Sequence, residues 1–368
     1  MGNQGIEAPT FGPWRGFNLL EKFTVDRNSP FSELDFQRMS EWGFDFVRLP
    51  MDYRCWIIGN DLYGINEKVM GEIDQAVEFG RLYGIHVNLC FHRAPGYCIN
   101  PPRERLNLWR DREAMEACEH HWRLFAKRYE GIPSTQVSFN LVNEPLGDDL
   151  SGDIGADIST YGQFAKRMFR AIREMDPGRL VMADGLITKG HYEPVPGIDD
   201  PLFGQSFHMY EPGWLTHLGA EWAHAWYVYG ENEQPTYPGI APNLDRYSEK
   251  LPSNSPDRGA YMAYRDVFVD KAWLEGWMGN YFDLMEKGTF IHCGELGIYA
   301  KKVPRGSQLN WYNDILDVLS KRNVGWAIWN FRGPFGVINT GRDGFHNVTL
   351  PNGDRLDGEL LNAIRSHL

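Results

Sequence analysis

Eight short apolar runs alternate with amphipathic segments along this chain, and that alternation limits the fold more than any other feature. Each run is rich in Val, Ile, Leu or Phe and is too short for a helix, so it is typical of a buried strand. The runs occupy residues 14–19, 44–49, 85–91, 135–142, 179–183, 203–207, 289–293 and 324–328. Strands that are apolar throughout and separated by helices indicate a parallel sheet covered on both faces.

Helical periodicity fills the intervals between these runs. The predicted helices span residues 32–42, 66–83, 112–129, 161–175, 264–287 and 307–322, followed by a C-terminal helix that places Leu360, Leu361, Ile364 and Leu368 on one face. Residues 188–196 hold two Pro and one Gly, so a loop or short turn is expected there. Eight strand and helix units predict an α/β fold of the closed (β/α)8 barrel type.

A doubly wound open sheet is the alternative fold. It would carry a Gly-rich nucleotide-binding turn after the first strand, and Arg15-Gly16-Phe17-Asn18-Leu19 is not such a turn. We therefore expect one catalytic barrel domain over residues 1–368. A long irregular segment at 211–257, after the sixth strand, is expected as an insertion within that domain.

Composition excludes some kinds of partner. The net charge is -12 over 368 residues, which disfavours binding to nucleic acid or to an anionic membrane. No apolar run reaches membrane-spanning length. The N-terminal residues lack the basic and apolar parts of a signal segment, so we expect a cytoplasmic protein unless a signal was removed. The five Cys are odd in number and form no CxxC motif, which favours free thiols and leaves one bridge, such as Cys55 with Cys98, open.

Polar residues stand where the predicted strands end. They are Arg48, His92, Asn143 with Glu144, His208 with Tyr210, Glu295 and Trp329. All strand carboxyl ends of a barrel open onto one face, and that face carries the chemistry. Individually these residues fit ordinary structural roles, such as a turn cap for Glu144 or an ion pair for Arg48. Their joint position predicts a site, and two carboxylates across a cleft are what glycoside hydrolysis requires.

This pattern resembles glycoside hydrolase family 5, a cellulase-like group of retaining (β/α)8 glycosidases. The residues that carry the resemblance are Arg48 in Val47-Arg48-Leu49-Pro50, His92, Asn143-Glu144-Pro145, His208-Met209-Tyr210, Gly294-Glu295 and Trp329. The resemblance implies a double displacement with Glu144 as acid/base and Glu295 as nucleophile.

The other site residues have roles that follow from the same resemblance. Glu295 would accept hydrogen bonds from Arg48 and Tyr210, which favour its charged form. Asn143 would hold the sugar 2-hydroxyl, and Trp329 would lie under the sugar whose bond is cleaved. His92 and His208 would orient the carboxylates and bind hydroxyls.

The insertion carries Trp214, Trp222 and Trp226, which are expected either to pack among themselves or to form a wall that stacks sugars. No cofactor or metal is expected, because Asn18-Leu19-Leu20 lacks the His-x-His of a metal-dependent barrel hydrolase and no strand ends in Lys for a Schiff base. The carbohydrate substrate is expected to be an oligosaccharide or short glycoside. An endo-acting β-glucanase or mannanase with an open cleft, a transglycosidase and a non-catalytic carbohydrate-binding barrel remain alternatives. Oligomeric state is left open.

Overall fold

Eight parallel strands form a closed barrel in the computed structural model, which describes residues 11–188, 191–342 and 344–368. The order around the barrel is β1-β12-β11-β10-β7-β6-β5-β2. The strands are β1 (Arg15–Asn18), β2 (Phe46–Asp52), β5 (His86–Arg93), β6 (Val137–Asn140), β7 (Val181–Asp184), β10 (Phe203–Met209), β11 (Ile291–Leu296) and β12 (Gly325–Ile328). Each predicted strand overlaps one of them, so the predicted (β/α)8 fold is confirmed.

Helices occupy the intervals between the barrel strands. They are α1 (Glu33–Glu41), α2 (Glu67–Tyr83), α3 (Arg112–Arg128), α4 (Ile158–Met175), α5 (Gly213–Thr216), α6 (His224–Tyr229), α7 (Leu244–Ser248), α8 (Pro256–Ala263), α9 (Lys271–Trp277), α10 (Gly279–Met285), α11 (Arg305–Lys321) and α12 (Gly358–Arg365), with 3-10 turns η1 (Val25–Arg27) and η2 (Tyr53–Cys55). Local chemistry sets several ends. Asn66 accepts a hydrogen bond from Val69 N at the start of α2, and Gly84 takes a left-handed φ of 68° at its end.

Three two-stranded sheets lie outside the barrel. They are β3 (Ile57–Ile58) with β4 (Asp61–Ile65), β8 (Leu186–Thr188) with β9 (His191–Glu193), and β13 (Val348–Thr349) with β14 (Arg355–Leu356). The β8–β9 hairpin stands where the sequence predicted a loop or short turn. The two prolines and one glycine of 188–196 lowered the strand signal, but β8 begins before that segment and pairs antiparallel with β9.

The predicted helix over 264–287 is wrong at its start, because α9 begins only at Lys271. Residues 264–266 form a turn, and Val269 then pairs with Gly239 in an antiparallel bridge. Asp270 then starts α9 by accepting a hydrogen bond from Trp273 N at 2.9 Å. A tertiary pairing has therefore overridden helix periodicity in this segment.

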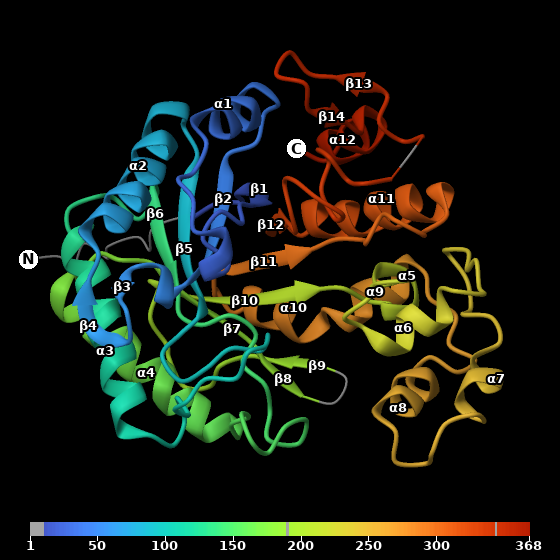
Figure 1. Ribbon diagram of the computed structural model, residues 1–368, viewed down its shortest axis with the longest axis horizontal. Helices are drawn as coiled ribbons and strands as arrows, with labels where there is room; N and C mark the ends of the chain where they lie inside the picture. The colour runs from blue at the N-terminus through green and yellow to red at the C-terminus, as the bar shows by residue number, and fades with distance from the viewer. Residues whose placement is uncertain (1–10, 189–190, 343) are drawn as a thin grey trace, which may run out of the picture. The chain divides into compact units, whose positions relative to one another are not determined.

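Contacts divide the chain into two compact units, one of Met1–Phe207 with Tyr281–His292 and one of His208–Asn280 with Cys293–Leu368. We describe each by itself, and the expected single domain stays a prediction. In the first unit, α2, α3 and α4 lie outside β2, β5 and β6 (Figure 1). Gly80 brings α2 so close to β5 that an added Cβ would lie 2.4 Å from the side chain of Val87.

The second unit contains the insertion, whose helices α5 to α7 are drawn in yellow to gold in Figure 1. Its aromatic side chains largely pack against one another. Trp226 contacts the rings of Tyr229 and Tyr261 at centroid distances of 6.0 and 5.5 Å. Trp214 and Trp226 are buried. The prediction that these two rings form a sugar-stacking wall is therefore wrong, because a buried ring cannot present its face to a substrate.

All five cysteines are buried and carry free thiols, as the favoured interpretation of their number predicted. The alternative bridge between Cys55 and Cys98 is not formed. Among the described residues, no helix combines the length and apolar character needed to cross a membrane.

Candidate active site

Glu144 lies in the first unit, four residues beyond the end of β6, and its backbone has a left-handed φ of 46°. This conformation is strained for a residue other than Gly, so neighbouring groups must hold it. Asp184 at the end of β7 accepts a hydrogen bond from Glu144 N at 3.2 Å. Tyr97 donates its hydroxyl proton to the carbonyl oxygen of Glu144 at 2.5 Å. Burial raises the pKa of Tyr97 well above its ordinary value, which keeps it a neutral donor.

Both carboxylate oxygens of Glu144 accept hydrogen bonds in the first unit. The hydroxyl of Tyr192, on β9, donates to Oε1 at 3.1 Å. The amide of Asn143 donates to Oε2 at 3.3 Å. The residue is half-buried, so its carboxyl group is held in place without being sealed from solvent.

Arg48, on β2, fixes the orientation of that Asn143 amide. Its guanidinium is buried and donates to Asn143 Oδ1 at 2.8 Å and to Asn140 Oδ1 at 2.9 Å. A guanidinium only donates, so the carbonyl of Asn143 must face Arg48 and its NH2 group is left for Glu144. Asp184 lies 3.3 Å from Arg48 and compensates its buried charge. Asn18 Oδ1 accepts a further hydrogen bond at 3.2 Å.

His92 is the predicted site residue on β5. It is buried on β5, its Nε2 lies 2.7 Å from Asn100 Oδ1, and its ring packs 4.3 Å from that of Phe23. A histidine held on one ring nitrogen has a fixed ring orientation, which is what a role in binding hydroxyls requires.

Glu295 lies in the second unit, inside β11 and 3% exposed. Tyr210 donates its hydroxyl proton to Glu295 Oε2 at 2.9 Å, as the sequence predicted. His208 Nδ1 lies 3.6 Å from the same oxygen. A phenol donor and a nearby imidazole both favour the ionised carboxylate. The expected hydrogen bond from Arg48 to Glu295 stays a prediction.

Trp329 borders an aromatic patch in the second unit. We define the patch as Tyr210, His217, Trp222, Tyr299 and Phe335. Trp329 and Tyr210 pack against the buried Tyr299 and Phe335. Trp222 contacts Tyr299 and Phe335 at centroid distances of 5.1 and 6.0 Å, and it is 62% exposed. Trp222 is therefore the one tryptophan of the three predicted for a wall whose ring is largely accessible.

Sequence reasoning missed four residues that hold Glu144 and Arg48: Tyr97, Asn140, Asp184 and Tyr192. Asp184 offered a usable signal, because it directly follows the predicted fifth strand, as Asn143 and Glu144 follow the fourth. Asn140 offered a similar signal, because it is an amide side chain inside an apolar strand. Tyr192 offered none, because its hairpin was expected to be a loop.

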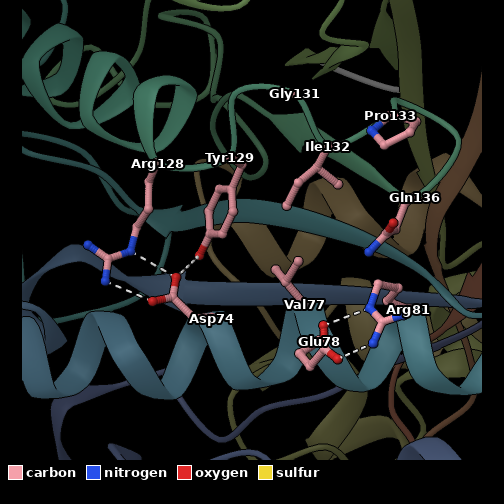
Figure 2. A pocket seen from close by; sticks show the side chains of 10 residues that line it. All are labelled: Asp74, Val77, Glu78, Arg81, Arg128, Tyr129, Gly131, Ile132, Pro133 and Gln136. Carbon is pink, nitrogen blue, oxygen red and sulfur yellow. Dashed lines mark hydrogen bonds and ion pairs between the residues drawn. The ribbon is translucent and has the colours of Figure 1, made fainter.

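A surface pocket of about 510 Å³ lies elsewhere in the first unit and contains none of these residues. Figure 2 shows that its charged side chains are already paired, Arg128 with Asp74 and Arg81 with Glu78. Gln136, which also lines it, precedes β6, whereas Glu144 follows that strand. The pocket therefore lies toward the amino end of β6, which is not the catalytic end of a barrel strand.

Comparison with known proteins agrees with this arrangement. Residues 9–333 match the family model for cellulase (glycosyl hydrolase family 5). Endoglucanase C of Acetivibrio thermocellus is 26% identical over 304 residues, covering 82% of this chain and 84% of the relative. Cellodextrinase A of Ruminococcus flavefaciens is also 26% identical, covering 79% and 76%.

Solved structures give the same result. One solved structure, described as the crystal structure of a glycoside hydrolase, has a sequence 31% identical to this chain. It superposes with a TM-score of 0.79 and covers 96% of this chain and 99% of its own. Cel5A of Thermotoga maritima, at 20% identity and a TM-score of 0.67, shares the fold over 95% of this chain and 97% of its own. The chain therefore belongs to glycosyl hydrolase family 5, and the protein is a glycosidase.

Proposed function

We propose that the protein hydrolyses short β-1,4-linked gluco-oligosaccharides with retention of anomeric configuration. Glu295 is the nucleophile and Glu144 the acid/base, and both act on the same glycosidic bond. The observation that carries the proposal is the contrast in hydrogen bonding between two carboxylates at barrel strand ends, in a chain of this family. The gluco-oligosaccharide class is supported by similarity to a cellodextrinase and an endoglucanase.

The first step begins at Glu295. One of its carboxylate oxygens attacks the anomeric carbon, and the bond from that carbon to the leaving oxygen breaks. The nucleophile must be ionised, and the 2.9 Å hydrogen bond from Tyr210 favours that state. A covalent glycosyl-enzyme results, with the configuration at the anomeric carbon inverted.

Glu144 supplies the proton in that step and removes one in the next. Its carboxyl proton passes to the leaving oxygen, so the departing sugar leaves as a neutral alcohol. The carboxylate that remains then takes a proton from water, which attacks the anomeric carbon and releases Glu295. Two inversions give net retention.

The supporting residues act on the sugar itself. Asn143, held by Arg48, donates to the 2-hydroxyl, a contact that tightens in the transition state. Trp329 offers an apolar plate to the apolar sugar face. His92 and His208 bind hydroxyls or orient the carboxylates.

The test is proton NMR of the sugar first released from cellotetraose or an aryl β-cellobioside. The expected product is the β-anomer, which then mutarotates. A first-formed α-anomer would refute the retaining mechanism and the pairing of Glu144 with Glu295.

Endo-action on a soluble β-glucan is the second candidate, and the match to an endoglucanase over most of both chains favours it. Viscometry separates the two candidates. A rapid fall in viscosity with few reducing ends released would indicate internal cutting, whereas slow loss of viscosity with accumulation of short sugars indicates the oligosaccharide preference.

A further inference from the structure

Tyr192 is a side chain of a two-stranded sheet outside the barrel, and its hydroxyl contacts the carboxylate of Glu144. It lies on β9 of the β8–β9 hairpin, which Figure 1 shows as a pair of short strands. Its hydroxyl lies 3.1 Å from Glu144 Oε1. We propose that Tyr192 is a positioning residue for the acid/base: it holds Oε1 as the carbonyl oxygen of the carboxyl group, so that Oε2 carries the proton given to the leaving group. The inference rests on the proposed role of Glu144.

The hairpin is joined directly to the segment that follows Glu144. Ile187 N donates to Pro145 O at 2.8 Å, and Gly147 N donates to Ile187 O at 2.7 Å. Ile187 is also the partner of Tyr192 across the hairpin. Tyr192 is therefore linked to the backbone next to Glu144 through Ile187 and Pro145. A shift of the hairpin would move the segment after Glu144, and the reverse.

The two faces of the hairpin do different things. Tyr192 and Ile187 lie opposite each other in the hairpin and share one face, and Tyr192 contacts Glu144 from that face. Leu186, Thr188 and Glu193 share the other face, which lines a separate pocket of about 330 Å³. Because neighbouring residues in a strand point to opposite faces, the register of β9 alone decides that position 192 reaches Glu144.

Close packing at Gly185 fixes where the hairpin leaves the barrel. An added Cβ there would lie 2.0 Å from Tyr281 Oη and 3.2 Å from Tyr192 Cβ. Tyr192 thus approaches Glu144 from a position with little room to move. An ordered donor loses less rotamer freedom when its hydrogen bond forms.

The hydrogen-bond donors around the Glu144 carboxyl group decide which of its two oxygens carries the proton. The amide nitrogen of Asn143, which can only donate, donates to Oε2 of Glu144. The hydroxyl of Tyr192 donates to Oε1. Arg48, Asp184 and Tyr97 are charged or titratable neighbours in the first unit, and they contact the backbone of Glu144 or the side chain of Asn143. The Tyr192 hydroxyl, in contrast, contacts the carboxylate itself.

The test compares Tyr192→Phe with wild type on two substrates. For cellotetraose, whose leaving group needs a proton, kcat/KM is expected to fall roughly tenfold. For a 2,4-dinitrophenyl β-cellobioside, which leaves unaided, kcat/KM should stay within about twofold of wild type. Loss of a donor to the charged form raises the pKa of Glu144, so the alkaline limb of kcat/KM for cellotetraose should move up by about one pH unit. Equal losses on both substrates, or an unmoved alkaline limb, would overturn the inference.

Two further variants separate this inference from the proposed function. Tyr83→Phe is the matched control, because it also removes a phenol hydrogen bond to a carboxylate, that of the surface residue Glu33 at 2.8 Å; it should match wild type in both assays. Glu144→Ala should lose cellotetraose cleavage far more than dinitrophenyl release, and adding Tyr192→Phe to it should cost nothing further. If Glu144→Ala behaves in this way and Tyr192→Phe matches wild type, this inference alone fails. If Glu144→Ala still cleaves cellotetraose, the acid/base assignment fails first.

Discussion

Glu144 and Glu295 have the same side chain in two very different settings. Glu144 is half-buried on a strained turn beyond its strand, with a φ of 46°. Glu295 is buried within β11, one residue before the strand ends. Glu144 receives hydrogen bonds on both oxygens from an amide and a phenol, whereas the contacts of Glu295 within its unit, with Tyr210 and His208, converge on Oε2.

The difference matches the two proposed roles. A nucleophile must keep one geometry of attack, and a regular strand holds it with little freedom. An acid/base must be neutral in one step and charged in the next, so partial exposure and neutral donors suit it better than a fixed charge partner.

The largest expected effect comes from Glu295→Gln. This change keeps the size of the buried side chain and removes the nucleophile, so kcat should fall by roughly 10⁵-fold with little change in thermal stability. Steady-state assays on cellotetraose and a thermal melt measure the two quantities. Glu249→Gln, on the exposed end of the insertion, is the control and should match wild type. A rate within tenfold of wild type for Glu295→Gln would show that another residue is the nucleophile.

A smaller effect on the opposite side of the pH profile is expected from Tyr210→Phe. Its hydroxyl favours the ionised form of Glu295, so removing it raises the pKa of that carboxyl. The nucleophile is then charged only at higher pH. The acidic limb of kcat/KM should therefore move up by about one pH unit, with roughly a tenfold loss at the old optimum. Movement of the alkaline limb instead would mean that Tyr210 acts on the acid/base, and the contrast with Tyr192 would collapse.

The barrel and the residues at its strand ends could be predicted from the sequence because both depend on local pattern. Continuous apolar runs mark buried parallel strands, and a polar residue directly after such a run is conspicuous. Arg48, Asn143 and Glu144 were found in this way. Asp184 satisfies the same rule, because it directly follows the predicted run at 179–183, so it was predictable in the same way.

Other features depend on contacts that no local pattern encodes. Tyr192 reaches Glu144 through the pairing of β8 with residues after β6, between segments 40 residues apart along the chain. The exposure of Trp222, against the burial of Trp214 and Trp226, depends on how the insertion packs upon itself. Tryptophan content alone predicts an aromatic surface or an aromatic core equally well.

The smallest expected effect separates those tryptophans. Trp222 is exposed beside Tyr299 and Phe335, in the patch that includes Tyr210, so Trp222→Ala should leave thermal stability nearly unchanged. If its ring stacks a distant sugar, KM for cellotetraose should rise about 3- to 10-fold with kcat unchanged, while KM for an aryl monoglucoside stays the same.

Trp226→Ala is the matched comparison, because that ring is buried against Tyr261 and Tyr264. Its loss should lower the free energy of unfolding by about 3 to 5 kcal/mol. Below the melting temperature, KM for cellotetraose should stay near that of wild type. If KM responds equally to both substitutions, the insertion contributes to binding through its overall fold and not through an exposed ring. If it responds to neither, the insertion does not contact the sugar chain, and the oligosaccharide preference must originate in the barrel loops themselves.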